Sequence, residues 1–307
     1  MENNQTITNY LITIIGATAI GKTNLSIQIA NHFNTEIISS DSRQFYKEMI
    51  IGTAVPSFKE LSTVPHHFIQ NRSIFKNYSV GQFEKEALQK LDELFKKTNI
   101  VVMVGGSGLY TNAVIEGLDY FPEVNSEIRE KLNKQLENGK LENLQLQLKK
   151  LDIESYNSIE IENPHRLIRA LEICIGTGKP YSQFKNKPKV KRNFIPLKIG
   201  LEAPREIMYQ RINKRVDIMI AEGLVGEAKE LYKHKNLNAL QTVGYKELFN
   251  YFDGNYTLDF AVEEIKKNTR RFAKRQVTWN KKDANINWFN FQENPSVIIK
   301  KIEKLIV

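Results

Sequence analysis

One short stretch of the chain combines glycines, a lysine and a threonine in a spacing that suits phosphate binding. Residues 16–23 read GATAIGKT and match the pattern G-x-x-x-x-G-K-[ST] in full. Glycines let the backbone turn several N–H groups toward one anion, and the helix expected after them adds the positive end of its dipole. The lysine would contribute a point charge, and the threonine hydroxyl would ligate Mg²⁺. The sequence therefore predicts a phosphate or diphosphate site formed by Gly16, Ala17, Thr18, Ala19, Ile20, Gly21, Lys22 and Thr23, with Thr23 as the metal ligand.

Two further stretches place polar side chains directly after expected strands. Asp41 follows a short strand expected over 35–39, at the edge where open α/β sheets bind ligands. It would bind a metal or accept a proton there, and a capping role on a loop explains it equally well. Gly105-Gly106-Ser107 follows the apolar run 100–104, so a ligand could approach the backbone and bond to Ser107, although strand-to-helix turns also need glycine.

Two arginines on one expected helix are spaced to act together. Arg211 and Arg215 are four residues apart and therefore share a helix face. They would clamp a diphosphate, or they would form a solvated pair facing Glu206 or Asp217.

A strongly basic segment occupies residues 266–282, with eight Lys or Arg and no Asp or Glu. Such a run should repel itself unless an anion lies nearby, and the repeated phosphates of a nucleic acid would fit. Phe272 and Val277 interrupt the basic positions and are expected to face the core, while Trp279 is either core or a stacking surface. Two stripes at i, i+4 spacing result: Lys266, Arg270, Lys274 and Lys267, Arg271, Arg275.

The elements that must position these groups alternate between strands and helices. Apolar runs predict buried parallel strands at 10–15, 35–39 and 100–104, and helical periodicity predicts helices over 22–33 and 79–97, the latter with a Ser79/Gln82 capping box. A strand over 194–201 would return to the same sheet, and long helices would span 204–222 and 257–282. The fold class is α/β, a P-loop NTPase-like parallel sheet flanked by helices.

A mostly helical insertion is expected at 122–190, between core segments 1–121 and 191–307. Its clearest helix begins at Asn163-Pro164, a cap followed by a first-turn proline, and runs through 175. Arg166 and Arg169 at the start of this helix indicate an anion contact. A basic connector, 185–192, closes the insertion.

Composition narrows the class of protein. The 307 residues carry a net charge of +9, which points to an anionic partner, nucleic acid ahead of a membrane. The single cysteine, Cys174, excludes a disulfide framework and is expected in the core. No signal-like start and no long apolar run is found, so we expect a soluble, cytoplasmic protein and a monomer.

Together these stretches resemble one family, the tRNA dimethylallyltransferases, from about residue 11 to 289. The motifs are GATAIGKT (16–23), SSDSRQFYKEMIIGTAVP (39–56), PHHF (65–68), YSVGQF (78–83), VGGSGLY (104–110), NPHRLIRALE (163–172), QTVGYKEL (241–248) and RRFAKRQVTW (270–279). Two departures are small: the family usually has GPTASGKT in the first motif, and threonine is common where Ser107 stands. Both keep the backbone cradle and a hydroxyl.

The resemblance implies that the P-loop holds the diphosphate of dimethylallyl diphosphate, with Mg²⁺. The N6 atom of adenosine 37, beside the tRNA anticodon, would attack the allylic C1 atom and release diphosphate. The implied catalytic residues are Asp41 as the base, Ser107 and Arg215, with Arg211 as a further diphosphate ligand. Implied tRNA contacts are Asp41, Ser42, Arg43, Gln44, Ser107, Arg129, His165, Arg166, Leu167, Ile168, Arg169, Gln241, Thr242, Val243, Gly244, Tyr245, Lys246, Lys274, Arg275, Gln276, Val277, Thr278, Trp279, Asn280 and Lys281.

Two alternatives remain from the residues alone. A P-loop small-molecule kinase shares the cradle, the second-strand Asp41 and a lid-like insertion, but leaves the basic helix without a role. A nucleotide-switched RNA-binding protein without catalysis explains the charge but leaves Asp41 idle. The strand at 100–104 ends in Gly-Gly, with no acidic residue of the kind that ATP-hydrolysing proteins place there, which weakens both.

Overall fold

The computed structural model describes residues 8–186 and 191–306, so 187–190 of the expected basic connector lie outside the described residues. The chain divides into two compact units. The first, here the sheet unit, comprises Met1–Glu116 and Arg192–Val307, and the second, the helical unit, comprises Gly117–Lys191. The helical unit contains the whole of the expected insertion 122–190 and begins at Gly117.

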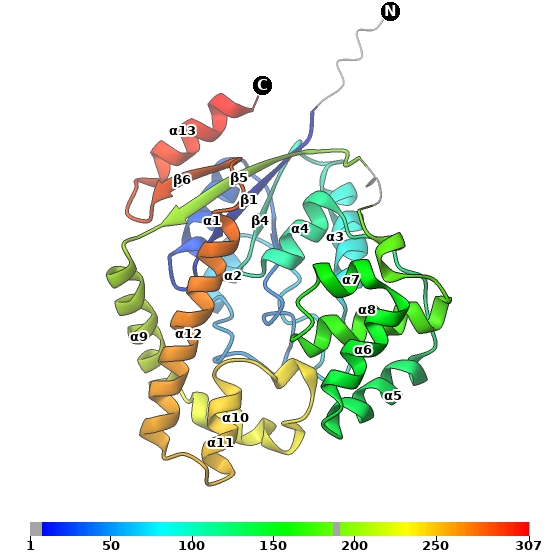
Figure 1. Ribbon diagram of the computed structural model, residues 1–307. Helices are drawn as coiled ribbons and strands as arrows, with labels where there is room; N and C mark the ends of the chain where they lie inside the picture. Colours follow the sequence, from blue (N-terminus) through cyan, green and yellow to red (C-terminus); the bar gives the residue numbers. More distant parts are fainter. Residues whose placement is uncertain (1–7, 187–190, 307) are drawn as a thin grey trace, which may run out of the picture. The chain divides into compact units, whose positions relative to one another are not determined.

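The described residues of the sheet unit form a six-stranded parallel sheet in the order β3-β2-β4-β1-β5-β6 (Figure 1). This confirms the expected parallel α/β fold, and the strand that follows the insertion does return to the same sheet, beside β1. The strands are β1 (Tyr10–Gly16), β2 (Ile37–Ser39), β3 (His66–His67), β4 (Ile100–Val104), β5 (Ile195–Glu202) and β6 (Ile286–Asn290).

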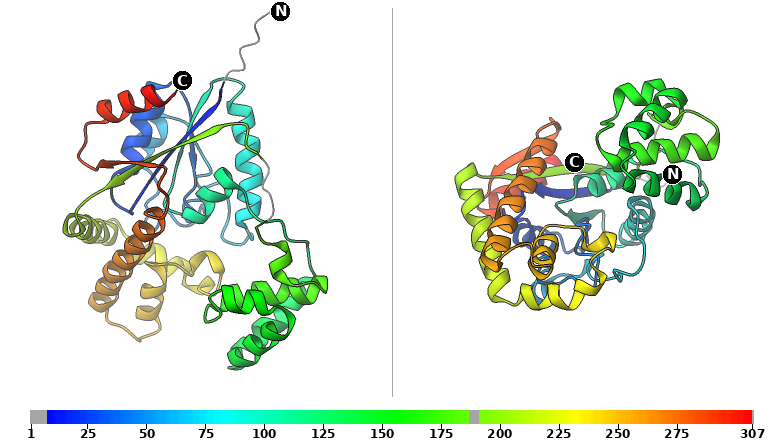
Figure 2. Two further views of the ribbon diagram at one scale, coloured as in Figure 1. Left: turned by 45° about the horizontal axis from the view of Figure 1, so that its top comes forward. Right: turned by 60° about the horizontal axis from the view of Figure 1, so that its bottom comes forward.

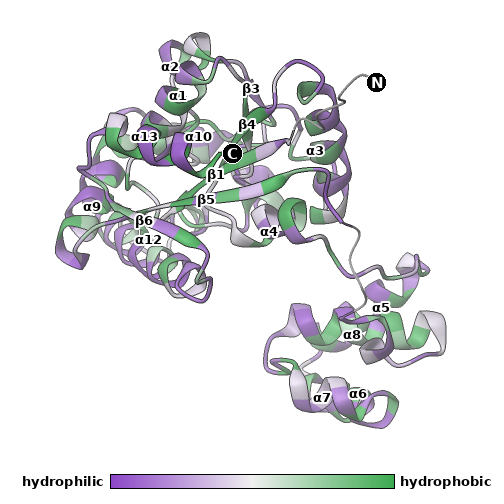
Figure 3. Ribbon diagram, turned by 90° about the horizontal axis from the view of Figure 1, so that it is seen from above, coloured by the Kyte–Doolittle hydropathy of each residue, from purple (hydrophilic) through white to green (hydrophobic). Residues whose placement is uncertain are grey.

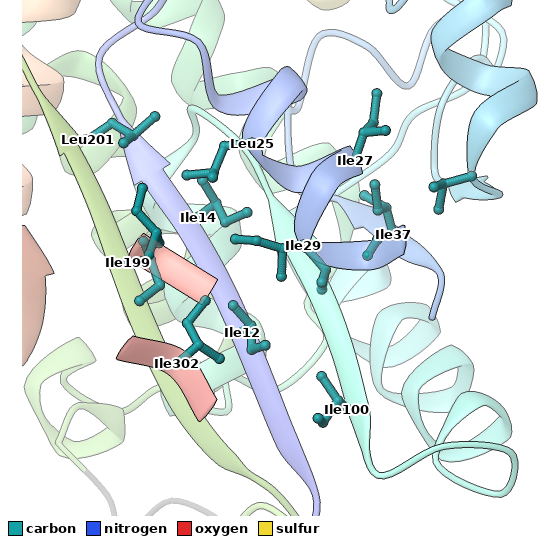
Figure 4. Close-up of a cluster of buried hydrophobic side chains, with 14 of the residues drawn as sticks. Ile12, Ile14, Leu25, Ile27, Ile29, Ile37, Ile100, Ile199, Leu201 and Ile302 are labelled. Atoms are coloured by element: carbon teal, nitrogen blue, oxygen red, sulfur yellow. The ribbon is translucent and has the colours of Figure 1, made fainter. Parts of the chain in front are cut away.

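Helices cover both faces of this sheet, which explains why β1 is buried along its whole length. Ile12 and Ile14 point to one face, where they pack with Leu25 and Ile29 of α1 and with Ile302 of α13 (Figure 4); the two helices themselves are seen in Figure 2. Alternate residues of β1 and β4 point to the other face and pack against α3 and α4. The apolar strands therefore lie between helices whose outer surfaces are polar (Figure 3).

Capping side chains define where the helices begin. The predicted capping box of α3 is confirmed: Ser79 accepts the Gln82 N–H at 3.2 Å, and the Gln82 side chain accepts the Ser79 N–H at 2.8 Å. Helices of the sheet unit are α1 (Lys22–His32), α2 (Phe58–Thr63), α3 (Val80–Leu94), α4 (Gly108–Glu116), α9 (Arg205–Ala221), α10 (Leu224–Leu231), α11 (Tyr245–Phe252), α12 (Leu258–Asn280) and α13 (Pro295–Leu305), with short 3-10 turns at Tyr232–His234 and Asn238–Leu240.

Helices α9 to α12 form a second core in the sheet unit. Leu224, Leu248 and Ile265 are among the residues buried there. The facing sides of α9 and α12 also pack on the P-loop, where Ile212 and Ala273 contact Ala17. The P-loop is thus supported by these helices as well as by the sheet.

The helical unit has its own small core. Leu132, Leu144, Leu148 and Leu171 are fully or almost fully buried in it. Cys174 is buried in the same core, as predicted, and its sulfur accepts the Tyr181 N–H at 3.3 Å. The helices are α5 (Ser126–Glu137), α6 (Leu141–Leu151), α7 (Ile153–Ser158) and α8 (Pro164–Thr177), followed by a 3-10 turn at Tyr181–Phe184; the Asn163 side chain caps α8 as predicted.

Some boundaries differ from the sequence prediction. Strand β2 begins at Ile37, because Thr35 ends the preceding helical turn: its N–H donates to the Ala30 carbonyl at 2.9 Å and its hydroxyl to the Ile100 carbonyl at 2.6 Å. Neither β3 nor β6 was expected, since each is a short edge strand. In the described ranges no helix combines the length and apolar character needed to cross a lipid bilayer.

Replacing Ile12 by alanine should lower the free energy of unfolding by about 2–5 kcal/mol, because the lost methyl groups leave a cavity in a closely packed core. Ile12 is fully buried. Ile195→Ala is the matched control, since this isoleucine is 51% exposed at the start of β5. Urea unfolding followed by circular dichroism measures both changes, and equal losses for the two variants would contradict the packing described.

Candidate active site

Two adjoining cavities open at the carboxyl edge of the sheet, and both are lined only by residues of the sheet unit. The first, here the P-loop cavity, has a volume of about 490 Å³ and is lined by the loop 18–24 and by α9. The second, here the acceptor cavity, has a volume of about 470 Å³ and extends between α9, α10 and α12. The residues that line both are Thr18, Asp41, Thr53, Gly106 and Arg215.

The P-loop has the backbone conformation that its glycines allow. Gly16 has φ 147° and Gly21 φ 112°, in the region that favours glycine. A Cβ at Gly16 would also lie 2.7 Å from the Leu201 carbonyl oxygen of β5, so the close contact with that strand needs glycine too. Thr18, Ala19, Ile20, Gly21, Lys22 and Thr23 line the P-loop cavity, whereas Ala17 is buried against α9 and α12.

Positive charge dominates the P-loop cavity. Lys22, Arg211, Lys214 and Arg215 line it together with only two carboxylates, Asp41 and Glu60. Burial lowers the pKa of Lys22 to about 8; the Asp41 carboxylate opposes this shift and Arg215 adds to it. Burial likewise lowers the pKa of Arg215, against the influence of Asp41 and Glu60. A bound polyanion would relieve the mutual repulsion of these cations.

The two arginines of α9 occupy different positions. Arg215 faces both cavities, whereas Arg211 lines only the P-loop cavity, where its Nε donates to the Ala19 carbonyl at 2.8 Å. Of the two acidic partners considered for a solvated pair, Glu206 and Asp217, the second pairs instead with Lys266 at 2.8 Å. Arg215 is thus the one of these two arginines that lies where the two cavities meet.

Both interpretations of Asp41 have structural support. Its Oδ1 accepts the Arg43 N–H at 3.1 Å, which is the local turn bond expected of a loop aspartate. Its Oδ2 faces Gly106, lying 3.5 Å from the position that a Cβ there would occupy, and the residue lines both cavities. The turn therefore fixes the carboxylate where the two cavities meet.

The turn after β4 lies directly against the turn after β2. A Cβ on Gly105 would lie 2.2 Å from the Ser40 Oγ, so only glycine fits. Ser107 Oγ lies 2.9 Å from Ser42 Oγ and accepts the Ser42 N–H at 3.2 Å. Ser107 thus ties the two turns together at the wall of the acceptor cavity.

Gln276 of α12 connects this region to the P-loop. It is 8% exposed, its Oε1 accepts the Thr18 N–H at 2.9 Å, and its Nε2 donates to the Gly106 carbonyl at 2.7 Å. The expectation that this side chain contacts tRNA is not supported, because both ends of its amide are used inside the protein. Sequence reasoning missed this role, which depends on contacts between residues more than 150 positions apart.

The start of the basic run of α12 is paired within the protein, so the repulsion expected along the run is relieved only in part. Lys266 pairs with Asp217 and Glu263, Lys267 pairs with Glu264 at 2.7 Å, and Arg270 donates to the Asn213 side chain. These partners lie outside the run, on α9 and in the preceding turn of α12. The exposed basic side chains that follow are Arg271, Lys274, Arg275, Lys281 and Lys282.

Aromatic side chains flank those exposed charges at the acceptor cavity. Trp279 is 47% exposed and lines the cavity, which favours the stacking-surface interpretation over a core position. Phe272 is 38% exposed and lines it as well, so the expectation that it faces the core is wrong. Val277 does pack beside Ile212 and Ala273, as predicted. Asn280 lines the cavity and Thr278 is exposed.

The remaining expected tRNA contacts of the sheet unit differ in whether they line a cavity, are exposed or are buried. Ser42, Arg43, Thr242, Val243 and Gly244 line the acceptor cavity, and Gln241 and Lys246 are exposed beside it in sequence. Gln44 lines the P-loop cavity and donates to the Thr53 and Ala54 carbonyls. Tyr245 is fully buried and bonded to Glu227, so its side chain is not a surface contact.

In the helical unit the expected contacts also divide by burial. His165 and Arg166 are exposed, and Arg166 lies 3.3 Å from Glu160. Arg129 and Arg169 both bind the buried carboxylate of Glu172, at 2.7 and 3.1 Å. Leu167 and Ile168 belong to the core of this unit, so the prediction that they contact tRNA is not supported for their side chains.

A metal ion would have few protein ligands here. Among the described residues no group of three or more His, Cys, Asp or Glu is placed to hold one. Mg²⁺ usually keeps several waters and binds through one or two protein oxygens plus substrate phosphates. Thr23 and Asp41 both line the P-loop cavity and supply suitable oxygens. The site therefore fits a metal that arrives with a diphosphate.

Diphosphate affinity should depend on the charge of Lys22. An anion favours the protonated amine, so affinity should be constant below about pH 8 and fall by up to about tenfold per pH unit above it. Titration calorimetry with inorganic diphosphate and Mg²⁺ from pH 7 to 9.5 measures this dependence. The ratio of wild-type to Lys22→Met affinity removes the ligand's own ionisation, and a ratio that does not change with pH would contradict the assignment.

Gln276→Leu should lower the free energy of unfolding by about 1–3 kcal/mol, because the Thr18 N–H and the Gly106 carbonyl lose their partner. Gln292→Leu, at an exposed glutamine, is the control. Urea unfolding and binding of an anticodon stem-loop are measured together. Unchanged stability with weakened RNA binding would show instead that Gln276 contacts the RNA.

Comparison with known proteins gives a consistent result. The family model described as IPP transferase matches residues 44–283. The tRNA dimethylallyltransferase of Flavobacterium psychrophilum is 61% identical over 300 residues, which cover 96% of this chain and 98% of the relative. That of Christiangramia forsetii is also 61% identical, covering 98% of this chain and 99% of the relative.

Solved structures agree with this assignment. The full-length tRNA isopentenylpyrophosphate transferase of Bacillus halodurans superposes with a TM-score of 0.71 at 37% identity, covering 97% of this chain and 95% of that one. A eukaryotic dimethylallyltransferase acting on tRNA gives a TM-score of 0.77 at 28% identity, covering 93% of this chain and 75% of that one. Because the family model matches most of the chain and these relatives align along nearly its whole length, the chain belongs to the IPP transferase family.

Proposed function

We propose that this chain transfers a dimethylallyl group from dimethylallyl diphosphate to N6 of adenosine 37 in tRNA, giving N6-(dimethylallyl)adenosine and diphosphate. One observation carries the proposal: Asp41 and Arg215 line both the cationic P-loop cavity and the acceptor cavity. A donor bound by its diphosphate in the first cavity would present its allylic carbon to a base entering the second.

The residues present can meet the demands of this reaction. The N6 lone pair forms a bond to C1 of the donor, the C1–O bond breaks, and its electron pair leaves with the diphosphate. Adenine N6 is a poor nucleophile, so we assign Asp41 as the base that accepts its proton. Lys22, Arg215 and the P-loop N–H groups stabilise the charge that develops on the leaving diphosphate, and Arg211 is a further ligand. Ser107 holds the turn that faces Asp41.

We further propose Mg²⁺ as the metal, held by the Thr23 hydroxyl with Asp41 nearby. Its chemistry when bound would be to neutralise charge on the diphosphate. Water must be kept from the allylic carbon during transfer. Apolar residues of the acceptor cavity, among them Ile212, Val216, Met219 and Leu224, provide a dry wall for this purpose.

The proposed RNA contacts are the exposed or cavity-lining members of the expected set. Adenosine 37 would have to leave the stacked anticodon loop to enter the acceptor cavity. Lys274, Arg275 and Lys281 would bind backbone phosphates, and Trp279 would stack on a base at the cavity rim. In the helical unit, His165, Arg166, Arg129 and Arg169 offer a basic surface for the anticodon stem-loop of A36-A37-A38 type.

We propose a cytoplasmic location, because the proposed substrate is a tRNA, and a monomer, because residues of one chain line both cavities. The alternative of a small-molecule kinase is not favoured. A kinase would give no role to the acceptor cavity or to the exposed lysine and arginine side chains of α12 beside it. In addition, β4 ends at Val104 and is followed by two glycines rather than by an acidic residue. The relatives described above are prenyltransferases.

Asp41→Ala should lower the rate of transfer by about 10²–10⁴-fold, since it removes the proposed proton acceptor. The assay follows labelled dimethylallyl diphosphate into an unmodified anticodon stem-loop containing A36-A37-A38, with Mg²⁺. Asp259→Ala, an exposed aspartate at the start of α12, is the control. Full transfer by Asp41→Ala would refute its role as the base. Absence of transfer by the wild type, with ATP-dependent phosphorylation of a metabolite, would instead establish the kinase.

A further inference from the structure

Glu227 of α10 makes an unusual number of contacts with the loop at residues 50–53, here the 50–53 loop. Its Oε2 accepts the N–H groups of Ile50 and Ile51 at 2.9 and 2.8 Å, and its Oε1 accepts the Gly52 N–H at 2.9 Å. Three consecutive backbone donors thus converge on one carboxylate. Such a nest of N–H groups is complementary to an anion, and here the protein supplies that anion itself.

Tyr245 is the fourth partner of this carboxylate. It is fully buried, and its hydroxyl donates to Glu227 Oε1 at 2.6 Å. Burial and the neighbouring Glu227 carboxylate raise the pKa of Tyr245, so the hydroxyl keeps its proton and remains a donor. The ring also lies 2.7 Å from the position that a Cβ on Gly52 would occupy, so the loop rests directly on the aromatic ring.

These contacts join two segments that line the acceptor cavity. Gly52 and Thr53 line the cavity from the 50–53 loop, and Thr242, Val243 and Gly244 line it from the segment just before Tyr245. Thr53 also lines the P-loop cavity, so the loop borders the junction at which donor and acceptor would meet. Both segments belong to stretches that the sequence singled out, 39–56 and 241–248, whereas Glu227 lies outside them.

We propose that Glu227 is a positioning residue for prenyl transfer: by binding the 50–53 loop and Tyr245 together, it fixes the separation of the walls between which donor and acceptor react. The inference rests on the proposed function. It gives the buried side chain of Tyr245 a role in shaping the acceptor cavity. A carboxylate suits this position because it only accepts hydrogen bonds, whereas an amide would turn its own N–H toward one of the loop donors.

Kinetics of Glu227→Gln test the proposal. Loss of charge-assisted bonds to the loop should lower kcat/KM for dimethylallyl diphosphate by about tenfold or more. Binding of the anticodon stem-loop should stay within about twofold of the wild type, because Glu227 lies behind the cavity wall. Tyr245→Phe, which removes one of the four bonds and keeps the ring, should give a smaller loss. Glu230→Gln, one turn further along α10 and exposed, is the matched control and should behave as the wild type.

Amide hydrogen exchange provides a readout that does not depend on activity. Exchange at residues 50–52 should quicken in Glu227→Gln and stay unchanged in Glu230→Gln. Titration of active sites shows whether Glu227→Gln molecules are altered or simply unfolded. A loss of kcat/KM that is fully explained by fewer active sites would overturn the proposal. A kcat/KM within twofold of the wild type, or a loss of RNA affinity as large as the loss of kcat/KM, would overturn it as well. If the wild type itself transfers no prenyl group, both the proposed function and this inference are refuted. If the wild type is active and Glu227→Gln is equally active, only this inference is refuted.

Discussion

Positive charge enclosed at the carboxyl edge of the sheet is the constraint on which the site depends. Lys22 and Arg215 both lie close enough to Asp41 to interact with its single carboxylate, and burial disfavours the charge of each cation. Removing charges from water is costly unless they are matched by opposite charge. The P-loop cavity is therefore suited to a polyanion that completes its charge balance. In the proposed reaction, the negative charge that develops on the leaving diphosphate would strengthen its attraction to these cations.

The same edge brings together segments that are distant in the chain. Parallel strands end side by side, so the loops after β1, β2 and β4 meet there, and glycines at 16 and 105 allow contacts too close for any other residue. Helix α12 joins this arrangement through Gln276, whose amide binds the P-loop and the turn after β4 at once. The helix that carries the exposed basic residues is thus bonded directly to the phosphate-binding loop. The P-loop and the helix that we propose to contact RNA are therefore connected by direct hydrogen bonds.

Some of the chain's basic residues are paired with acidic groups within the protein and are therefore not simply available to an anionic partner. On α12, Lys266 and Lys267 at the start of the basic run are paired with acidic groups of α9 and of the helix itself, and in the helical unit Glu172 binds two arginines. The exposed pairs on α12 contribute little to stability as surface ion pairs, whereas the carboxylate of Glu172 is buried. The exposed basic side chains that follow in this run are Arg271, Lys274 and Arg275 on α12 and Lys281 and Lys282 just after it, and Arg275 lines the acceptor cavity.

The sequence by itself determined the parallel α/β fold, the P-loop, the helical insertion, the capping of α3 and α8 and the return of β5 to the sheet. Each of these follows from residues that are neighbours in the chain, through periodicity, caps or a short motif. The edge strands β3 and β6 were not predicted, because short strands at the edge of a sheet show little of the hydrophobic pattern by which strands are recognised. Only the tertiary structure decided which side chains face solvent: Leu167, Tyr245 and Gln276, expected to contact tRNA, are buried, whereas Phe272, expected in the core, is exposed. It alone also revealed Glu227, because hydrogen-bond partners more than 170 residues apart are set by how the chain packs and leave no local trace in its sequence.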